Sequence, residues 1–130
     1  MPHFGEHLTF DGYGGDPELL GSESIVRDAI VTLVEALGMT VLGGPEVYFA
    51  SPTGMKDSGG WTGFVVLQES HISIHTFSAQ GFVSADVYTC KNGIDADLLR
   101  HILSSSFGTT THDVTVLKRG LRFPGTQNGW

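Results

Sequence analysis

Apolar and polar residues alternate with a period of two along several stretches of the chain, which is typical of β-strands with one buried face. Near the start, Leu8 and Phe10 alternate with Thr9 and Asp11. Comparable extended stretches are predicted over residues 7–15, 39–51, 61–70, 71–77, 82–90 and 112–120, and residues 61–77 read as one long extended run. The Gly43-Gly44-Pro45 sequence interrupts the second stretch and indicates a bulge or a hairpin.

Two segments change to the helical period of 3.6 residues. Residues 22–38 predict the main helix, which Ser22 or Ser24 caps and Gly38 ends. Residues 95–108 predict a second helix, and Asp16 followed by Pro17 indicates a short helical turn before the first. The predicted buried positions are Ile25, Ala29, Ile30, Leu33, Val34 and Leu37 in the main helix, and Leu98, Leu99, Ile102 and Leu103 in the second.

The elements therefore follow the order β-α-β-β-β-β-α-β. Short turns join the neighbouring strands, and short turns require antiparallel neighbours. We expect an α+β fold, a two-layer sandwich in which two main helices cover one face of an antiparallel sheet. With 130 residues, no repeat and no linker, the chain is predicted to form a single domain, residues 1–130.

Charge and composition argue against several classes of function. The formal net charge is −7, from 14 acidic against 7 basic residues, and no Lys/Arg cluster is present, so no nucleic-acid partner is expected. No apolar run reaches membrane-spanning length, and the N-terminus lacks the pattern of a targeting segment, so no membrane partner is expected either. Cys90 is the single cysteine, which excludes an internal disulfide and fits a reducing compartment. We expect a cytoplasmic protein.

Polar residues stand in the middle of the most strand-like segment, residues 63–78. His71, Ser73 and His75 share one face of the predicted strand, whereas Ile72 and Ile74 share the other. If the helices cover the isoleucine face, the histidine face meets water, a ligand or another subunit. Two histidines four residues apart on a strand lie roughly 13 Å apart, too far to bind one zinc ion, so no metal site is predicted.

The bond between Glu69 and Ser70 offers a different chemistry. A serine hydroxyl can attack the preceding carbonyl to form an ester. Loss of the serine α-proton then breaks the chain and leaves a dehydroalanine, which hydrolyses to a pyruvoyl group. The reaction needs a strained peptide, a base and a hydrogen-bond donor, and His75 and Thr62 are candidates for the last two. Glu-Ser alone is too common a dipeptide to establish this chemistry.

The longer segments around this bond are far more specific. TGFVVLQESHISIHTF, residues 62–77, and GFVSADVYTC, residues 81–90, resemble the prokaryotic-type S-adenosylmethionine decarboxylase proenzymes. That family reads Thr/Ser-Gly-Val-Val, then Glu-Ser-His-x-Ser/Thr-Ile-His-Thr, then Asp-Val-Phe-Thr-Cys. HLTFDGYG near the start and VLKRG near the end extend the resemblance over residues 6–120.

The resemblance implies a pyruvoyl-dependent carboxy-lyase that cleaves itself between Glu69 and Ser70 into a β chain, 1–69, and an α chain, 70–130. Ser70 would become the covalent pyruvoyl cofactor, which forms a Schiff base with the α-amine of a small-molecule substrate. His75 would take the serine α-proton with help from Thr62, and Cys90 would donate a proton to the decarboxylated product. Family members form homodimers of cleaved αβ protomers, with sites at or near the subunit interface.

The sequence departs from the family at the substrate site. The family usually reads Trp-Pro-Glu-x-Gly where residues 77–81 read Phe-Ser-Ala-Gln-Gly, so Ala79 replaces a glutamate that is expected to hold the ribose hydroxyls. Loss of such charge-assisted hydrogen bonds should cost about 1.5–3 kcal/mol. Tyr48, Phe49 and Phe77 are candidates for substrate binding, and MKDSGGW, residues 55–61, is inserted before Thr62.

Three functions remain open at this point. The first is decarboxylation of S-adenosylmethionine to the aminopropyl donor of spermidine biosynthesis. The second is the same pyruvoyl chemistry on ornithine or arginine, also on a route to polyamines. The third is an uncleaved pseudoenzyme that binds or regulates a partner. Five titratable residues have no assignment: His3, His7, Asp11, His101 and His112.

Overall fold

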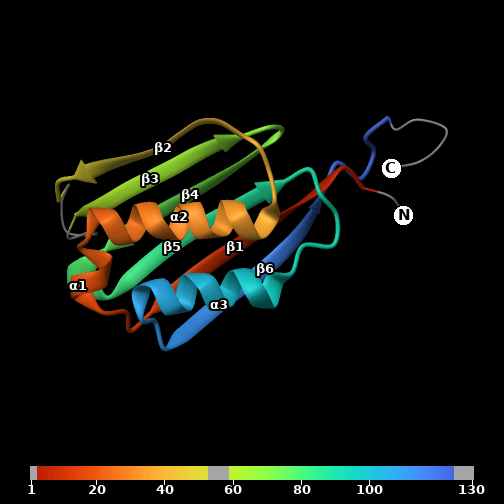
Figure 1. The fold of residues 1–130 in the computed structure, drawn as a ribbon. Helices are drawn as coiled ribbons and strands as arrows, with labels where there is room; N and C mark the ends of the chain where they lie inside the picture. The colour runs from red at the N-terminus through yellow and green to blue at the C-terminus, as the bar shows by residue number, and fades with distance from the viewer. Residues whose placement is uncertain (1–2, 53–58, 125–130) are drawn as a thin grey trace.

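A computed structural model describes residues 3–52 and 59–124, and these residues form two layers (Figure 1). One layer is a six-stranded antiparallel sheet with the strand order β2-β3-β4-β5-β1-β6. Helices α2 and α3 lie together on one face of it, so the predicted α+β two-layer sandwich is confirmed. The strands are β1 (Gly5–Tyr13), β2 (Val41–Ala50), β3 (Gly60–Leu67), β4 (Ser70–Phe77), β5 (Phe82–Thr89) and β6 (Thr111–Arg119). The helices are α1 (Pro17–Leu20), α2 (Glu23–Leu37) and α3 (Ala96–Phe107), with a 3₁₀ turn, η1, at Ser78–Gln80.

The helix boundaries follow from local capping. Ser22, rather than Ser24, caps α2, because its hydroxyl oxygen accepts a hydrogen bond from the backbone N–H of Ile25. Gly38 ends the helix in the left-handed conformation, with φ of 64°, which glycine adopts without steric cost. The carboxylate of Asp95 caps α3.

The core fills the space between the sheet and the two helices. On α3 the buried side chains are Leu99, Leu103 and Phe107, spaced four residues apart along one face. The predicted burial of Leu98 is wrong, since this side chain is 41% exposed. On α2 the stripe runs through Val26 instead of Ile25, which is only partly buried at its margin. The full core set is Leu8, Phe10, Leu20, Val26, Ala29, Ile30, Leu33, Leu37, Val65, Leu67, Ile72, Ile74, Val83, Ala85, Val87, Leu99, Leu103 and Phe107.

Two predicted extended stretches are irregular in the structure. In β2 the register against β3 shifts between Val41 and Gly43 and again between Gly43 and Glu46, so the Gly-Gly-Pro sequence makes a bulge and not a hairpin. The run over residues 61–77 is not continuous: β3 ends at Leu67, and β4 begins at Ser70. The two residues between them form a tight turn that reverses the chain.

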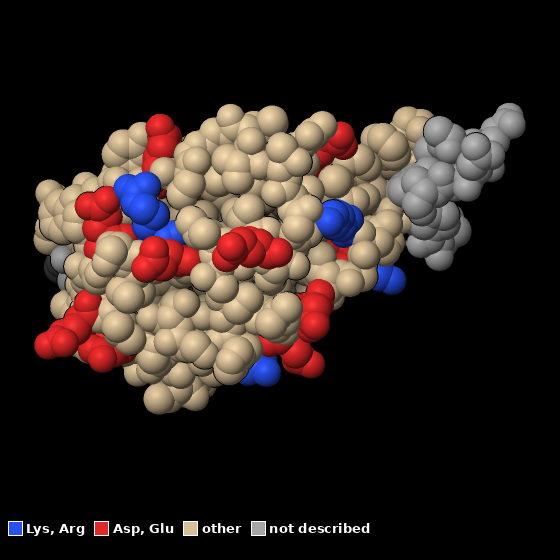
Figure 2. All heavy atoms as spheres, viewed as in Figure 1, with Lys and Arg blue, Asp and Glu red and all other residues tan. Residues whose placement is uncertain are grey.

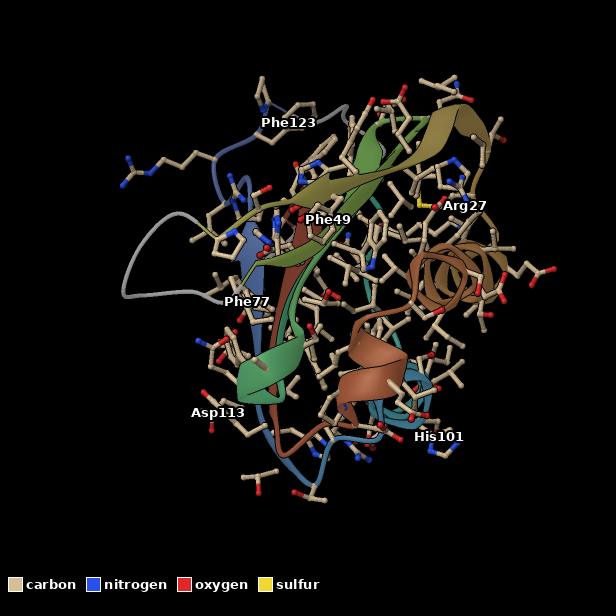
Figure 3. The ribbon with its side chains drawn as sticks, turned by 90° about the vertical axis from the view of Figure 1, so that its left-hand side faces the viewer. Arg27, Phe49, Phe77, His101, Asp113 and Phe123 are labelled. Carbon is tan, nitrogen blue, oxygen red and sulfur yellow. The ribbon has the colours of Figure 1, made fainter. Side chains whose placement is uncertain are left out.

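The face of the sheet away from the helices is open. Along β4, Ile72 and Ile74 are fully buried under the helices, whereas His71 is exposed and Ser73 and His75 are partly exposed, as predicted. Figure 3 shows Phe77 and Asp113 on this open side and His101 beside α3 on the other. Figure 2 shows acidic side chains spread over the helix-covered side, without a broad basic patch there. Within the described residues, no helix has the length and apolar character needed to cross a membrane.

Candidate active site

The turn between β3 and β4 carries the most unusual backbone of the described residues. Glu69 has φ of +62°, and it is the one non-glycine residue there with a positive φ. A side chain in this left-handed region crowds its own carbonyl and costs roughly 1–2 kcal/mol. Glu69 itself is exposed, and its carbonyl belongs to the peptide bond that precedes Ser70. The strain therefore lies on the bond that the sequence predicts to be cleaved.

Ser70 lies beside Cys90. Ser70 is only 7% exposed, and its Oγ accepts a hydrogen bond from the backbone N–H of Cys90, with an N···O distance of 3.1 Å. Cys90 directly follows the last residue of β5, and this strand is the neighbour of β4. The hydroxyl oxygen, the strained peptide and the thiol-bearing residue therefore meet at one end of the sheet. We call Glu69, Ser70 and Cys90 the cleavage half-site.

Thr62 and His75 form a second pair. They lie opposite each other in the β3–β4 ladder, and Thr62 Oγ1 lies 3.1 Å from His75 Nδ1. In the tautomer whose Nδ1–H donates to the hydroxyl, Nε2 carries a lone pair and can accept a proton. This is the arrangement that a base oriented by a hydroxyl requires. We call Thr62 and His75 the histidine half-site.

The two half-sites do not meet within one chain. Five residues separate Ser70 from His75 along β4, a span of roughly 16 Å in an extended strand. Their side chains also point to opposite faces, because an odd separation changes the face of a strand. Ser70 follows the buried side with Ile72 and Ile74, whereas His75 lies on the open side. Of the predicted catalytic residues, the structure thus brings together Ser70 with Cys90, and Thr62 with His75.

Of the predicted substrate-binding aromatic residues, Tyr48 and Phe77 lie near the histidine half-site, and Phe49 does not share their face. Tyr48 lies opposite Thr62 in the β2–β3 ladder and is 57% exposed. A hydrogen bond to Glu46 raises the pKa of Tyr48. Phe49, 61% exposed, lies edge-on to the Trp61 ring at 5.3 Å.

Phe77 lies two residues beyond His75 on the same strand, and its ring is 5.4 Å from that of Phe82 on β5. By strand alternation Tyr48 and Phe77 share the open face with His75, while Phe49 points to the other side of β2.

The sequence matches the family described as S-adenosylmethionine decarboxylase over residues 6–120. The chain belongs to the S-adenosylmethionine decarboxylase family. A protein of Brevibacillus brevis named S-adenosylmethionine decarboxylase proenzyme is 34% identical over 118 residues, 91% of this chain and 84% of the relative. A Thermococcus onnurineus protein of the same name is 34% identical over 122 residues, 93% of this chain and 81% of the relative.

The fold agrees with this assignment. A crystal structure of the adenosylmethionine decarboxylase from Aquifex aeolicus superimposes with a TM-score of 0.76, covering 98% of this chain and 99% of that one at 24% identity. At this identity the match shows a common fold. Membership of the S-adenosylmethionine decarboxylase family makes the chain a decarboxylase, that is, a carboxy-lyase.

Within this family the chain is unusual after the histidine half-site. Ala79, at the position of the usual glutamate, lies exposed in η1 and offers no hydrogen-bonding side chain. Its neighbour Gln80 is also exposed. Most of the insertion at residues 55–61 lies outside the described residues, which resume at Gly59.

A polar cluster on the open face was not predicted. His7 Nε2 lies 2.9 Å from Asp86 Oδ1, and Arg119 Nη1 lies 3.3 Å from His7 Nδ1. The Arg119 guanidinium also lies 5.2 Å from the centre of the Tyr88 ring. Strand alternation puts Asp86 and Tyr88 on the same face of β5, but the pairing of β1 with β5 and β6 that assembles the cluster has no local signal in the sequence. In the described residues no group of three or more His, Cys, Asp or Glu side chains is placed to hold a metal ion.

Proposed function

We propose that this chain is a self-cleaving, pyruvoyl-dependent decarboxylase of S-adenosylmethionine that acts in polyamine synthesis in the cytoplasm. The observation that carries the proposal is the geometry of one bond. Glu69 is held in a left-handed conformation, and the hydroxyl of the next residue, Ser70, is anchored by the N–H of Cys90. Both residues stand in the motif of a family whose relatives are named proenzymes.

Self-cleavage follows from these groups. Ser70 Oγ attacks the carbonyl carbon of Glu69 as the C–N bond breaks, so an ester replaces the amide and the nitrogen takes up the hydroxyl proton. Strain at Glu69 raises the energy of the peptide and favours this exchange. A base then removes the Cα proton of residue 70, and the Glu69 carboxylate leaves with the β chain. The remaining dehydroalanine takes up water and loses ammonia, which leaves a pyruvoyl group at residue 70.

The base cannot be His75 of the same chain, because it lies roughly 16 Å along the strand and on the other face. Proton transfer requires approach to about 3 Å, directly or through one water. We therefore infer that His75 and Thr62 act on Ser70 of a second copy. In a two-fold dimer the interface uses the same patch on both copies. Ser70 is the first residue of β4 and directly follows the exposed Glu69, so each histidine half-site would reach the other copy's cleavage half-site at this end of the sheet.

The open face of the sheet supports such a dimer. It presents large apolar side chains beside the polar ones, including Phe64 and Val66, each 38% exposed, and Leu117, 48% exposed. The helices cover the opposite face, so this one has no partner within the described chain. A broad sheet face with exposed apolar residues is typical of a surface that a second subunit covers.

After cleavage, the residues of the cleavage half-site would serve decarboxylation. A pyruvoyl group supplies a keto carbonyl conjugated with an amide, which binds an amine and accepts the electron pair released with carbon dioxide. Cys90 is partly exposed and lies beside residue 70, so its thiol can deliver a proton to the product side of that centre.

One observation favours a second candidate substrate. Ala79 leaves the position of the ribose-binding glutamate without a polar side chain. The same chemistry on ornithine or arginine would not need that glutamate, because neither substrate has ribose hydroxyls to hold.

A carbon dioxide release assay distinguishes these readings. Purified chain would be offered S-adenosylmethionine, ornithine and arginine, each labelled at the carboxyl carbon, with Ser70→Ala as the inactive control. We expect release from S-adenosylmethionine that depends on Ser70. Release from ornithine or arginine alone would assign the second substrate class. A chain that splits yet releases nothing from any of them would overturn the assignment as a decarboxylase of these substrates.

A further inference from the structure

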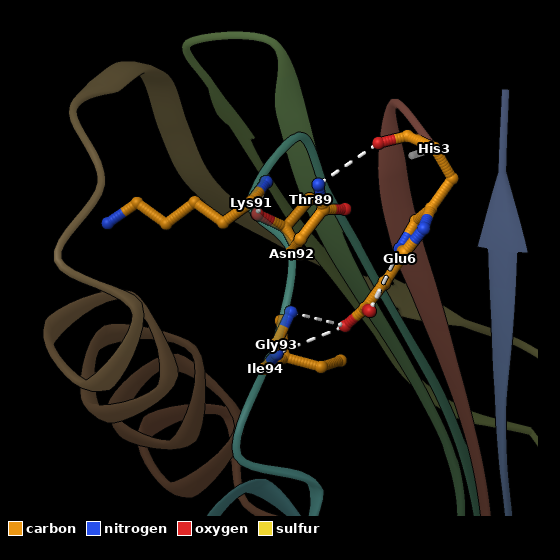
Figure 4. A network of polar contacts seen from close by, with 7 residues as sticks. All are labelled: His3, Glu6, Thr89, Lys91, Asn92, Gly93 and Ile94. Atoms are coloured by element: carbon orange, nitrogen blue, oxygen red, sulfur yellow. Dashed lines mark hydrogen bonds and ion pairs between the residues drawn. The ribbon is translucent and has the colours of Figure 1, made fainter. Parts of the chain in front are cut away.

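The loop that follows Cys90 is held by a buried carboxylate from β1 (Figure 4). Oε1 of Glu6 accepts hydrogen bonds from the backbone N–H groups of Gly93 and Ile94, at 3.1 and 3.0 Å. Glu6 is only 8% exposed. Burying a carboxylate costs free energy unless hydrogen-bond donors compensate for the lost water, and here the two backbone N–H groups do so. The loop geometry and the charge of Glu6 therefore depend on each other.

His3 completes the network. Its Nε2 lies 3.1 Å from Glu6 Oε2, and its backbone oxygen accepts a hydrogen bond from Nδ2 of Asn92 at 3.0 Å. Nδ1 of His3 is buried and has no hydrogen-bond partner among residues 3–52 and 59–124, so the tautomer with Nε2–H donating to the carboxylate fits the site. Burial opposes ionisation of Glu6, but the hydrogen bonds from Ile94, Gly93 and His3 outweigh it and lower the pKa of this carboxyl.

The backbone of β1 at Gly5 also packs closely against Thr89 and Cys90. A side chain at Gly5 would place its Cβ 2.2 Å from the carbonyl oxygen of Thr89 and 3.0 Å from Cα of Cys90. On the other side, the Thr89 hydroxyl accepts the N–H of Lys91, and Nζ of Lys91 donates to the carbonyl of Leu37 at the end of α2. Residues 3–6 thus fix one flank of Cys90, and the 91–94 loop is tied down on the other.

We propose that Glu6 is a positioning residue that holds the thiol of Cys90 in place against residue 70. Glu6 does not touch the reacting atoms and acts through the backbone of the loop after Cys90. The effect of Glu6 on turnover rests on the proposed function. The effect of Glu6 on the position of Cys90 does not, and it can be measured separately.

Cys90 is the single cysteine of the chain, so the reaction of a thiol reagent reports on this site alone. We would measure the rate at which Ellman's reagent labels the native full-length chain. Glu6→Leu keeps the approximate size but removes the acceptor, whereas Glu6→Gln keeps an acceptor oxygen for Gly93 and Ile94. Asp95→Ala is the matched control, since it removes the cap of α3 at the far end of the same loop without touching the carboxylate network.

We expect Glu6→Leu to raise the labelling rate about tenfold or more, because loss of charge-assisted hydrogen bonds raises the population of the open loop by that order. Glu6→Gln should stay within about threefold of the wild type, and Asp95→Ala should leave the rate unchanged. If Glu6→Leu fails to fold, Asn92→Ala would be tested in its place. Loss of its one hydrogen bond to the backbone of His3 should raise the labelling rate of Cys90 about threefold.

A second readout concerns the product. With a displaced thiol, the proton reaches the carbon of residue 70 instead of the substrate carbon. Water then hydrolyses the bond between the substrate carbon and its nitrogen, so the decarboxylated substrate leaves as an aldehyde and the nitrogen stays on residue 70 as alanine. Mass spectrometry of the α chain after turnover should show more alanine in Glu6→Leu than in the wild type, Glu6→Gln or Asp95→Ala.

Equal labelling of Glu6→Leu and wild type, or an equal rise in Asp95→Ala, overturns the role of Glu6. So does a labelling rise without any change in the alanine fraction of an active enzyme. A wild-type chain that never cleaves refutes the proposed function instead, while the labelling rates still decide whether Glu6 positions Cys90.

Discussion

The division of the site between two copies can be tested by complementation. We would co-express two inactive variants, His75→Ala and Ser70→Ala, with different tags so that each chain is followed by mass. In a mixed dimer, Ser70 of the first variant would meet His75 of the second, which restores one complete site. The other site of the same dimer would lack both residues.

The structure determines which chains should be cleaved and therefore the expected cleaved fraction. Ser70 and His75 of one chain lie roughly 16 Å apart on opposite faces of β4, far beyond the approach of about 3 Å that proton transfer requires. His75 therefore cannot reach Ser70 of its own chain, and if His75 is the base we expect only mixed dimers to mature. With equal expression and random pairing, about half of the His75→Ala chains fall in mixed dimers and should be cleaved.

The assay is intact-mass analysis of both tagged chains after prolonged incubation. Each variant expressed alone should stay whole. The control is His75→Ala co-expressed with a chain that carries both substitutions; neither chain of that dimer has His75, so both should also stay whole. Failure of the mixture to produce any α chain, while the mixed dimer is isolated through both tags, would refute the shared site.

Three further predictions concern single residues. Ser70→Ala should leave the chain whole on a denaturing gel and release no carbon dioxide, and splitting of this variant would remove Ser70 from the mechanism. Cys90→Ala should still cleave but turn over slowly and accumulate alanine at residue 70, whereas wild-type turnover would assign Cys90 to packing alone. Folding lowers the pKa of Glu6 below its ordinary value of 4.5. The ionised carboxylate therefore stabilises the folded chain above pH 4.5, and this stabilisation is lost as the pH falls through the folded-state pKa. The difference in unfolding free energy between wild type and Glu6→Gln, from urea titrations, should shrink from about pH 6 to about pH 3, and a constant difference would contradict this.

The layers of the fold are readable in the sequence because they rest on local periodicity. Leu8 and Phe10 on β1, and Ile72 and Ile74 on β4, alternate with polar residues and are all fully buried. The C-terminal end of α2 at Gly38 was predictable because it depends on the backbone conformation of that glycine and involves few neighbours. Leu98 was misplaced because the helix face that meets the sheet depends on how α3 packs, and two adjacent leucines cannot indicate which of them turns inward.

The open face that bears His75 was also predictable, because it follows from alternation along β4. The Glu69–Ser70 bond was selected through the resemblance to the family motif, and its cleavage stays a prediction. Other features depend on contacts between distant segments. The anchoring of Ser70 by Cys90 spans 20 residues, and the hydrogen bonds of Glu6 to the loop after Cys90 span 87 and 88. No local pattern encodes such contacts, because they follow from strand order and register.

The central claim is that the chain breaks its own backbone before residue 70 and converts that residue into a ketone. Intact-mass spectrometry of the freshly purified wild-type chain, followed over prolonged incubation, tests it most directly. The account predicts two species, residues 1–69 ending in a free carboxylate and residues 70–130 beginning with a pyruvoyl group. A single unbroken chain of unchanged mass, or a split product that begins with an ordinary serine, would contradict it.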